Sequence, residues 1–397
     1  MGVKPFYWAV HKGVFYFASE IKAILKVGVP AKPNDKIIYD YLVYGFYHHS
    51  EETFFKDINE LAPGRSLIVS NGKISLRRYW YLPERTRTIE KISDIEVKDE
   101  FLRLLENSVK IQLRSDVPVG LSVSGGLDSS LLTAMVDRVS GGEKNFALYH
   151  FNYAGKQYEE ELPYAKLLAK NLNWQTPTIV KVGPGDMPSS VSKIMWHEEQ
   201  PFPGLPTVAW HKLYQSLGKT ETIVTLEGHG GDEMAAGYDY YIGSFLLDIV
   251  KSRGAIGMHE EFNKIALIRG LKEERMLSFF ANGLEAYFRG GVSADASRFA
   301  NLDCLDKKFL DSKFPFPDFE RPFDSYLSNF QYRELMHTKL PRVLRSVDRE
   351  SMAYGRELRV PLLDHRLVEF AFSLPINQRI RDGHQRFFMR NAASGLL

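Results

Sequence analysis

The sequence contains a single cysteine, Cys304, among its 397 residues. One cysteine excludes an intrachain disulfide and is typical of proteins that work in the reducing cytosol. No apolar run reaches the roughly 18 residues that a transmembrane helix needs, and the first residues, MGVKPFYWAV, lack the charged-then-apolar order of a signal peptide. We therefore expect a cytoplasmic protein.

An excess of charge of one sign is also lacking. The 51 Lys and Arg residues nearly balance the 49 Asp and Glu residues, and the net charge is +2. This balance does not favour a general nucleic-acid or membrane-surface role, because both of those partners are negatively charged. The 11 histidines form no HExxH motif and no cluster with ligand spacing, so no zinc site is predicted. We expect neither nucleic acid nor a membrane among the partners.

The first 85 residues are rich in β-strand signals. Aromatic and β-branched runs at 6–10 and 14–18 predict a hairpin, and Ser19 is a candidate N-cap for a short helix after it. A second hairpin is predicted from the runs SLIV and KISL, which flank an Asn71-Gly72 turn. Residues 83–94 are polar and begin with proline, and we interpret them as a linker.

From about residue 96 onward, strand and helix patterns alternate. Strands are predicted at 119–124, 146–151, 176–182 and 222–226, and helices at 101–113, 130–139 and 162–172. This alternation favours βαβ units and a parallel sheet covered on both faces. Beyond about residue 240 the pattern is mainly helical. The predicted fold class is α/β, with a parallel sheet followed by a helical carboxy-terminal part.

Two loops after predicted strands combine glycines with carboxylates. They read SGGLDSS from Ser124 and EGHGGDE from Glu227. Glycines let backbone N–H groups approach an anion, and hydroxyls and a helix amino terminus near Ser129 add further donors. Asp128 would repel a bare phosphate, so its presence implies a bridging cation, most simply Mg²⁺. If the two strands are neighbours, Asp128 and Asp232 would share this ion and hold a pyrophosphate.

Taken alone, each loop is also compatible with an ordinary turn that caps a helix. Neither loop matches the Walker pattern or G-x-G-x-x-G, so P-loop and dinucleotide sites are not predicted. Because both loops follow strands and both carry carboxylates, we favour one shared phosphate site over two unrelated turns.

Four segments, in order along the whole chain, resemble one family. SGGLDSS is similar to the pyrophosphate loop of the N-type ATP pyrophosphatases, which cleave ATP to AMP and pyrophosphate. LEGHGGDEMAAGY, LPRVLRSVDRESMAYGRELRVPLLDHRLVEFAFSLP and GVKPFYWAVHKGVFYFASEIKAIL narrow the resemblance to the asparagine synthetases. The resemblance implies a partial β-rich, glutaminase-type (Ntn) domain at 1–85, the remnant of a type-2 glutamine amidotransferase domain. It implies an ATP pyrophosphatase domain, the asparagine synthetase domain proper, at 95–397.

The resemblance also implies a ligase activity and a set of ligand contacts. An aspartate carboxylate would attack the α-phosphorus of ATP to give aspartyl-AMP, and ammonia would then displace AMP to give asparagine. Asp128 and Asp232 would hold Mg²⁺, and a homodimer is compatible with the family. The implied ATP-binding residues are Val123 and Leu148 at the adenosine, Glu227 and Gly228 at the adenine through their backbone, and Ser124, Gly125, Gly126, Asp128 and Ser129 at the pyrophosphate.

Two residues of the implied site depart from the family pattern. His229 stands where many synthetases have glutamate and related ring-forming synthetases have tyrosine. It could accept a proton from the incoming amine, since an unperturbed imidazole titrates near 6.5, or it could contact ligand only through its backbone. Arg386 stands where the family has a lysine facing the α-phosphate, which keeps the charge but changes its geometry.

The amino terminus departs further. The family's glutaminase uses an amino-terminal cysteine exposed by removal of the first methionine, whereas here Gly2 follows Met1. Residues 1–5 align with an internal part of the glutaminase domain, so about half or more of that domain is missing. We expect a fragment of a longer gene or a start assigned too late, and a chain that uses free ammonia and does not hydrolyse glutamine.

Other functions remain open at this stage. A lasso-peptide cyclase or a β-lactam synthetase would retain the pyrophosphate loop, although the segment from Asp348 to Asp364 favours the asparagine branch. A non-catalytic binding chain would not need both Asp128 and Asp232. Residues 196–201, WHEEQP, resemble a family segment on the acceptor side of the cleft, and the alternative for them is a solvated helix end.

Overall fold

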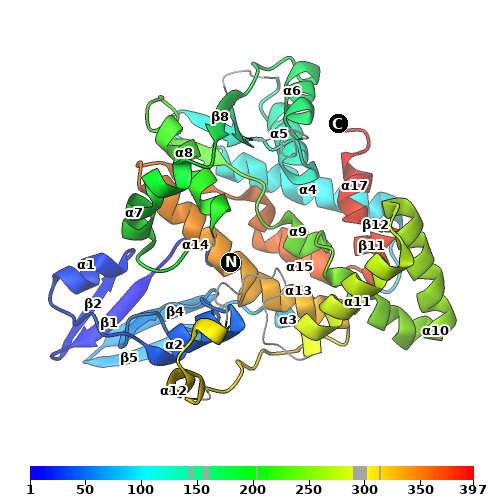
Figure 1. Cartoon of the computed structure of the whole chain (residues 1–397). Coiled ribbons are helices and arrows are strands. Elements are labelled where there is room, and N and C mark those ends of the chain that lie inside the picture. The colour runs from blue at the N-terminus through cyan, green and yellow to red at the C-terminus, as the bar shows by residue number, and fades with distance from the viewer. Residues whose placement is uncertain (143–145, 155–160, 203, 289–301, 313) are drawn as a thin grey trace. The chain divides into compact units, whose positions relative to one another are not determined.

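The computed structural model describes residues 1–142, 146–154, 161–202, 204–288, 302–312 and 314–397 (Figure 1). The chain divides into two compact units. Unit 1 comprises residues 1–88, 236–343 and 372–386, and unit 2 comprises residues 89–235, 344–371 and 387–397. Residues 236–343 thus group with the amino-terminal region in this division.

Unit 2 is built on a five-stranded sheet in the order β10-β9-β6-β7-β8. Every pair of neighbouring strands in it is parallel. The strands are β6 (Val119–Ser122), β7 (Ala147–Tyr153), β8 (Thr178–Val182), β9 (Val224–Leu226) and β10 (Glu357–Arg359). The predicted parallel α/β sheet is confirmed, and β10 is an edge strand that the sequence pattern did not reveal.

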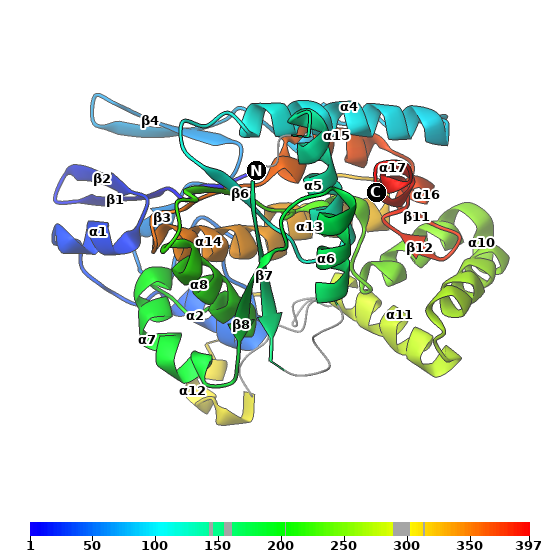
Figure 2. The ribbon, with the colours of Figure 1, turned by 90° about the horizontal axis from the view of Figure 1, so that it is seen from above.

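Helices cover both faces of this sheet. The chain moves from β6 to β7 and β8 in one direction and then returns to β9 on the other side of β6. Right-handed crossovers therefore place the helices before β8 on one face and those after β8 on the other. Figure 2 shows α5 and α6 on one side of β7 and β8, and α7 and α8 on the other. Their bounds are α5 Leu127–Val139, α6 Leu162–Asn171, α7 Asp186–Glu198 and α8 Leu205–Leu217. The start of α5 at Leu127 corrects the predicted start near Ser129, because Gly126 is the N-cap.

The long helix α4 (Asp94–Gln112) begins with a capping box, in which the Ser93 hydroxyl accepts from the Glu96 backbone and the Glu96 carboxylate accepts from the Ser93 backbone. Its buried side packs against α5 and α17. The remaining elements that lie wholly or partly in unit 2 are α9 Gly231–Ala235, α14 Lys339–Met352, η4 Pro361–Leu363, α15 His365–Ser373 and α17 Phe387–Ala393.

Unit 1 contains the predicted β-hairpins. β1 (Tyr7–His11) pairs antiparallel with β2 (Val14–Ala18) and with β3 (Ile58–Glu60). β4 (Arg65–Ser70) and β5 (Lys73–Arg78) form the second hairpin, and its turn residues have φ values of 50° at Asn71 and 73° at Gly72. Two positive φ values are what a two-residue hairpin turn requires, so this prediction is confirmed.

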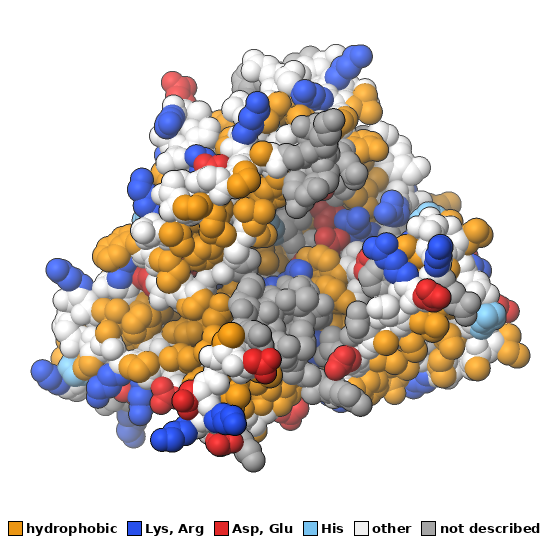
Figure 3. All heavy atoms as spheres, viewed as in Figure 1, with side chains coloured by type: hydrophobic (Ala, Val, Ile, Leu, Met, Phe, Trp, Pro, Cys, Tyr) orange, Lys and Arg blue, Asp and Glu red, His pale blue; other side chains and the backbone are white. Residues whose placement is uncertain are grey.

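One face of the β1–β2–β3 sheet packs on a small core that includes Tyr7, Ala9 and Ile58. Its other face carries aromatic rings in a row, with Phe6 stacked on Phe17 and Trp8 stacked on Phe15. Figure 3 shows hydrophobic side chains gathered at the surface over β1 and β2. Period-2 alternation therefore puts apolar side chains on both faces of this sheet.

The helices of unit 1 pack around a second core. α10 (Tyr241–Arg269) is interrupted at Gly254, whose φ of 70° breaks the helical path, and it packs on α11 (Glu273–Phe288) and α13 (Tyr326–Met336). Short elements complete this unit, namely α1 Ile21–Lys26, α2 Asp35–Tyr39, η1 Asp40–Tyr44, α3 Leu82–Arg85, η3 Leu302–Cys304, α12 Lys307–Leu310, α16 Ile376–Arg379, β11 Ile380–Arg381 and β12 His384–Gln385. Among the helices of the described ranges, none combines the length and the apolar character needed to cross a membrane.

Two predictions in the first 95 residues are wrong in detail. Glu20, not Ser19, is the N-cap of α1, and no side chain caps that helix. The predicted linker at 83–94 contains most of α3, because Pro83 in the first turn of a helix costs no backbone hydrogen bond.

Candidate functional site

The site predicted from the sequence lies where the direction of the sheet connections reverses. β6 and β9 are neighbours, while the chain leaves β6 towards β7 and leaves β9 towards β10. At such a switch point no crossover helix covers the carboxyl ends of the two strands, and ligands of open α/β sheets bind there. Val123 follows β6 and Glu227 follows β9, so both glycine-and-carboxylate loops start at this position.

The first loop is folded on itself by its own hydroxyl groups. The backbone N–H of Gly126 donates to Ser124 Oγ at 3.1 Å, and Ser129 Oγ lies 3.0 Å from Ser124 Oγ. Gly125 has a φ of 88°, and a Cβ there would lie 3.0 Å from the backbone nitrogen of Ala165. The loop therefore requires glycine at Gly125 for both its conformation and its contact with α6.

Strand neighbours fix the backbone before this loop. The Val123 N–H donates to the carbonyl of Tyr149 at 2.8 Å, and the Val123 carbonyl lies 2.8 Å from His150 Nδ1. Val123 and Leu148 are 1% and 3% exposed, so both side chains are buried in unit 2. Their predicted contact with an adenosine stays a prediction.

The second loop touches Asp128 directly. A Cβ added at Gly228 would lie 3.3 Å from Asp128 Cβ, and one added at Gly231 would lie 2.6 Å from Asp128 Cγ. Real Cβ atoms do not approach other atoms as closely as the second distance. The two loops are therefore brought together at the Asp128 carboxylate, and this contact is possible only because Gly231 has no side chain.

Asp128 and Asp232 are the candidate ligands of a magnesium ion that is carried by a nucleotide. Asp232 directly follows Gly231 and is partly exposed, and Asp128 faces Gly231 from α5. In the described part of the chain, no group of three or more His, Cys, Asp or Glu side chains could by itself hold a metal ion. Mg²⁺ is usually bound by one or two carboxylates together with substrate phosphates and waters, so two carboxylates suit it.

His229 makes side-chain contacts within the second loop. Its Nε2 lies 2.9 Å from Glu227 Oε2, and its ring lies edge-to-face on Trp210 with centroids 5.9 Å apart. The His229 side chain is 21% exposed, and the Glu227 side chain is 5% exposed. Burial lowers the pKa of His229, but the hydrogen bond and charge of Glu227, with the charges of Glu233 and Asp128, raise that pKa by more.

Two residues of α8 that border this loop were not predicted from the sequence. Tyr214 donates from Oη to Glu227 Oε1 at 2.5 Å, and Trp210 packs on His229 as described above. Burial, and after it the charge of Glu227, raises the pKa of Tyr214 well above its ordinary value. Trp210 and Tyr214 are four residues apart and so share one helix face, which is a signal that periodicity alone could have supplied.

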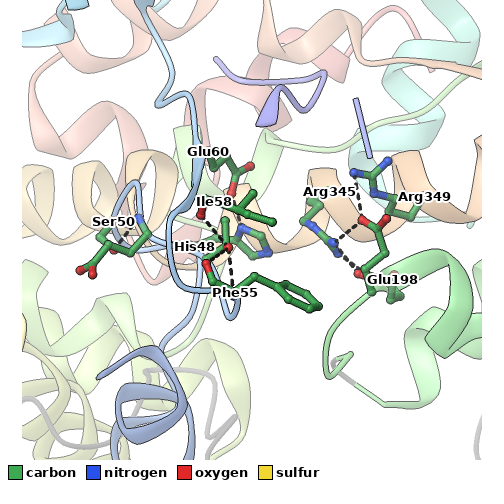
Figure 4. Close-up of polar contacts among 11 residues, drawn as sticks. His48, Ser50, Phe55, Ile58, Glu60, Glu198, Arg345 and Arg349 are labelled. Carbon is green, nitrogen blue, oxygen red and sulfur yellow. Dashed lines mark hydrogen bonds and ion pairs between the residues drawn. The ribbon is translucent and has the colours of Figure 1, made fainter. Parts of the chain in front are cut away.

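The WHEEQP segment at the end of α7 is buried at Glu198 and Gln200, whereas Trp196 is 64% exposed. The interpretation as a solvated helix end is therefore wrong for the two buried side chains. Glu198 is 1% exposed and accepts hydrogen bonds from Arg345 Nη1 at 2.6 Å and from the hydroxyl of Ser346. Glu199 has a φ of 60° and lies 3.6 Å from Arg349 Nη2. Figure 4 shows Arg345 and Arg349 of α14 beside Glu198.

A second buried hydrogen-bonded chain lies beside this cluster. Glu350 Oε2 is 2.6 Å from His211 Nδ1, and His211 Nε2 is 2.9 Å from Tyr354 Oη. Burial, and after it the charge of Glu198, raises the pKa of Glu350 to about 9, although Arg345 opposes the shift. Burial and nearby cations lower the pKa of His211 to about 4. Near neutral pH the pair is therefore uncharged, with a proton on Glu350.

Arg386 belongs to unit 1, where it follows β12 and has a φ of 56°. Its predicted role at the α-phosphate stays a prediction. In the same unit His48 Nδ1 lies 2.7 Å from Glu60 Oε2 (Figure 4). The single cysteine, Cys304, is exposed in η3.

Comparison with known proteins identifies the family of this chain. The family model for asparagine synthase matches residues 100–397, and the model for a glutamine amidotransferase domain matches residues 1–80. The putative glutamine-hydrolyzing asparagine synthetase 2 of Methanocaldococcus jannaschii is 30% identical over 75% of this chain and 58% of its own length. Glutamine-hydrolyzing asparagine synthetase 1 of Bacillus subtilis is 25% identical over 100% of this chain and 62% of its own length. Amidase chyE of Penicillium rubens is 25% identical over 96% of this chain and 61% of its own length.

The chain therefore spans about three fifths of the length of these curated relatives. The asparagine synthase model covers the greater part of the chain and includes both strand-end loops of unit 2. The chain belongs to the asparagine synthase family.

Proposed function

We propose that this chain forms asparagine from aspartate, ATP and ammonia. In the first step an oxygen of the aspartate side-chain carboxylate attacks the α-phosphorus of ATP, and the bond to pyrophosphate breaks, which gives aspartyl-AMP. In the second step ammonia attacks the acyl carbon, AMP leaves with the electron pair of the broken C–O bond, and the nitrogen loses a proton. The observation that carries this proposal is the contact of the two switch-point loops at Asp128.

The first loop is the part of unit 2 best suited to the pyrophosphate of ATP. Ser124, Gly125, Gly126 and Ser129 offer hydroxyl and backbone donors at the amino-terminal end of α5, where the helix dipole favours an anion. Val123 and Leu148 would lie at the adenosine, and Glu227 and Gly228 would contact the adenine through their backbone. Arg386 would supply positive charge at the α-phosphate.

Asp128 and Asp232 would hold Mg²⁺, which, when bound with ATP, neutralises charge on the phosphate oxygens and on the departing pyrophosphate. The close fit of Gly231 against Asp128 supports this assignment, because a carboxylate beside an anion cradle is otherwise unfavourable. The protein's own contribution is to fix the Asp128 side chain between two loops before substrate arrives.

His229 would accept the proton that the incoming nitrogen loses. Its side chain is partly exposed and hydrogen-bonded to Glu227, which supports a side-chain role over a contact through the backbone only. The Glu227 carboxylate would stabilise the imidazolium that forms, as a carboxylate does for other catalytic histidines.

We further propose that these 397 residues, assayed as such, use ammonium and not glutamine. A type-2 glutaminase needs an amino-terminal cysteine, and the one cysteine of this polypeptide is Cys304 in η3.

The direct test is release of pyrophosphate from ATP in the presence of Mg²⁺ and ammonium, screened over candidate carboxylates. Aspartate should give the highest rate, together with equal amounts of asparagine and AMP. A higher rate with another carboxylate would reassign the acceptor, and no pyrophosphate release with any carboxylate would refute the proposed function.

A further inference from the structure

We propose that Glu227 and Tyr214 are positioning residues that hold the His229 imidazole in a single tautomer and orientation for the amide-forming step. This inference rests on the proposed function and deepens it. It assigns the Glu227 side chain a role that is separate from the adenine contact proposed for its backbone.

Both oxygens of the Glu227 carboxylate are engaged. Oε1 accepts from Tyr214 Oη at 2.5 Å, and Oε2 lies 2.9 Å from His229 Nε2. Glu227 is 4% exposed and Tyr214 is fully buried. An ionised carboxylate can only accept hydrogen bonds, so the imidazole nitrogen next to it must carry a proton.

The tautomer follows from this contact. With the proton on Nε2, the lone pair of a neutral His229 lies on Nδ1, and Nδ1 makes no hydrogen bond to the residues that the structure describes. Nδ1 is therefore the nitrogen that can accept a proton from an attacking amine. The opposite tautomer would place two lone pairs, those of Nε2 and of the carboxylate, against each other.

Helix α8 restrains His229 through two of its residues, one that packs on the imidazole and one that holds Glu227. Trp210 and Tyr214 lie one turn apart on α8, and the Trp210 ring meets the imidazole edge-to-face at an interplanar angle of 78°. Tyr214 also lies 3.1 Å from Thr225 Oγ1 on β9, which ties its hydroxyl to the strand that precedes the loop. Trp210 thus restricts the rotation of the imidazole, and Glu227 determines which of its two nitrogens carries the proton.

Other acidic groups near His229 cannot replace Glu227. Glu233 on α9 and Asp128 on α5 act on His229 through their charge, but neither is hydrogen-bonded to its ring in the described chain. A merely structural Glu227 would stabilise the loop and affect both chemical steps alike. A positioning Glu227 affects the second step selectively.

The test compares Glu227→Gln, Tyr214→Phe and His229→Gln with the parent chain. Pyrophosphate release and asparagine formation are measured separately, and ¹⁵N NMR of histidine-labelled protein reports the tautomer, with the His229→Gln spectrum identifying the signal of His229. Tyr149→Phe is the matched control, since it also removes a buried tyrosine hydroxyl from unit 2. Within the described residues this hydroxyl is hydrogen-bonded to Thr220 and Thr222, which lie outside the site.

We expect the parent to show the Nε2–H tautomer above the pKa of His229, and Glu227→Gln to show a mixture. Asparagine formation should fall on the order of 10²-fold in Glu227→Gln and His229→Gln, within the usual contribution of general base catalysis, while pyrophosphate release is retained. Tyr214→Phe should cost about fivefold in the same step, which corresponds to one net hydrogen bond. The control should match the parent.

An Nδ1–H tautomer in the parent, or an unchanged tautomer in Glu227→Gln, would overturn the inference. Equal losses in both chemical steps would also overturn it and would make Glu227 structural. The spectra are recorded without substrate, so they decide the geometry even if the parent releases no pyrophosphate, a result that would refute the proposed function instead.

Discussion

The Asp128 carboxylate occupies the space that a side chain at Gly231 would need, so the loop after β6 and the loop after β9 meet at one carboxylate. In the nucleotide site that we propose, the first loop would supply donors, and the second would supply Asp232, which follows the residue in contact with Asp128. The parallel pairing of β6 with β9 sets this geometry, because it places two strand ends side by side.

Asp128→Ala should abolish pyrophosphate release. The substitution removes a proposed metal ligand but leaves the hydroxyl and backbone donors of the first loop, so binding of nucleotide without Mg²⁺ should change little. The measurement is pyrophosphate release together with nucleotide affinity, with and without Mg²⁺. Release at a rate near that of the parent would show that Asp128 holds no catalytic ion.

Gly231→Ala tests the loop contact itself. The added methyl group must displace the Asp128 carboxylate, so we expect pyrophosphate release to fall at least tenfold, as small misplacements of reacting groups often cost this much or more. Gly185→Ala is the control, because no atom lies near a Cβ there and its φ is −73°. Equal activities of the two variants would mean that Asp128 can move without consequence.

A glutamine assay tests the proposed nitrogen source. The purified 397-residue chain should form asparagine with ammonium chloride and should release no glutamate from glutamine, because Cys304 is exposed in η3 and is not an amino-terminal residue. Glutamate is measured directly, and Cys304→Ser serves as a control for reaction at that thiol. Glutamate release that persists in Cys304→Ser would reveal a hydrolytic site other than a cysteine.

The local features of this protein were predictable, and the long-range ones were not. The Asn71-Gly72 turn and the strand-end loops depend on residues within a few positions. Because parallel strands end at the same edge of a sheet, the sequence also predicted that the two loops lie together. By contrast, Arg345 meets Glu198 across 147 residues, and His211 meets Glu350 across 139. No periodicity encodes such pairs, so the sequence left a solvated helix end open for residues 196–201, in which Glu198 is buried.

Removal of one partner of the buried Arg345–Glu198 pair should destabilise the protein strongly, because the other partner is left buried without its counter-charge. Arg345→Met should lower the free energy of unfolding by about 3–5 kcal/mol, since Glu198 then stays buried with fewer donors. The double variant Glu198→Leu with Arg345→Met should be more stable than Arg345→Met alone, because no unpaired charge remains. Denaturant unfolding measures both. Arg103→Met, at an exposed pair with Glu100, should have little effect.

The Glu350–His211 pair should make stability fall as pH rises from about 6.5 to 9. Glu350 has its folded-state pKa raised from 4.5 to about 9, so above 4.5 the folded chain holds a proton that the unfolded chain has lost. His211 has its pKa lowered from 6.5 to about 4, so below 6.5 the unfolded chain holds the extra proton. The two effects cancel between 4.5 and 6.5, and only that of Glu350 remains above 6.5.

The expected slope above pH 6.5 is at most about 1.4 kcal/mol per pH unit. Glu350→Gln keeps a neutral side chain that can donate to His211 Nδ1, so it should flatten this slope and should be more stable than the parent at pH 9. Glu90→Gln, at an exposed position, should leave the slope unchanged. The measurement is denaturant unfolding at pH values from 6.5 to 9. A parent slope that survives in Glu350→Gln would show that this carboxyl group is already ionised in the folded protein at neutral pH.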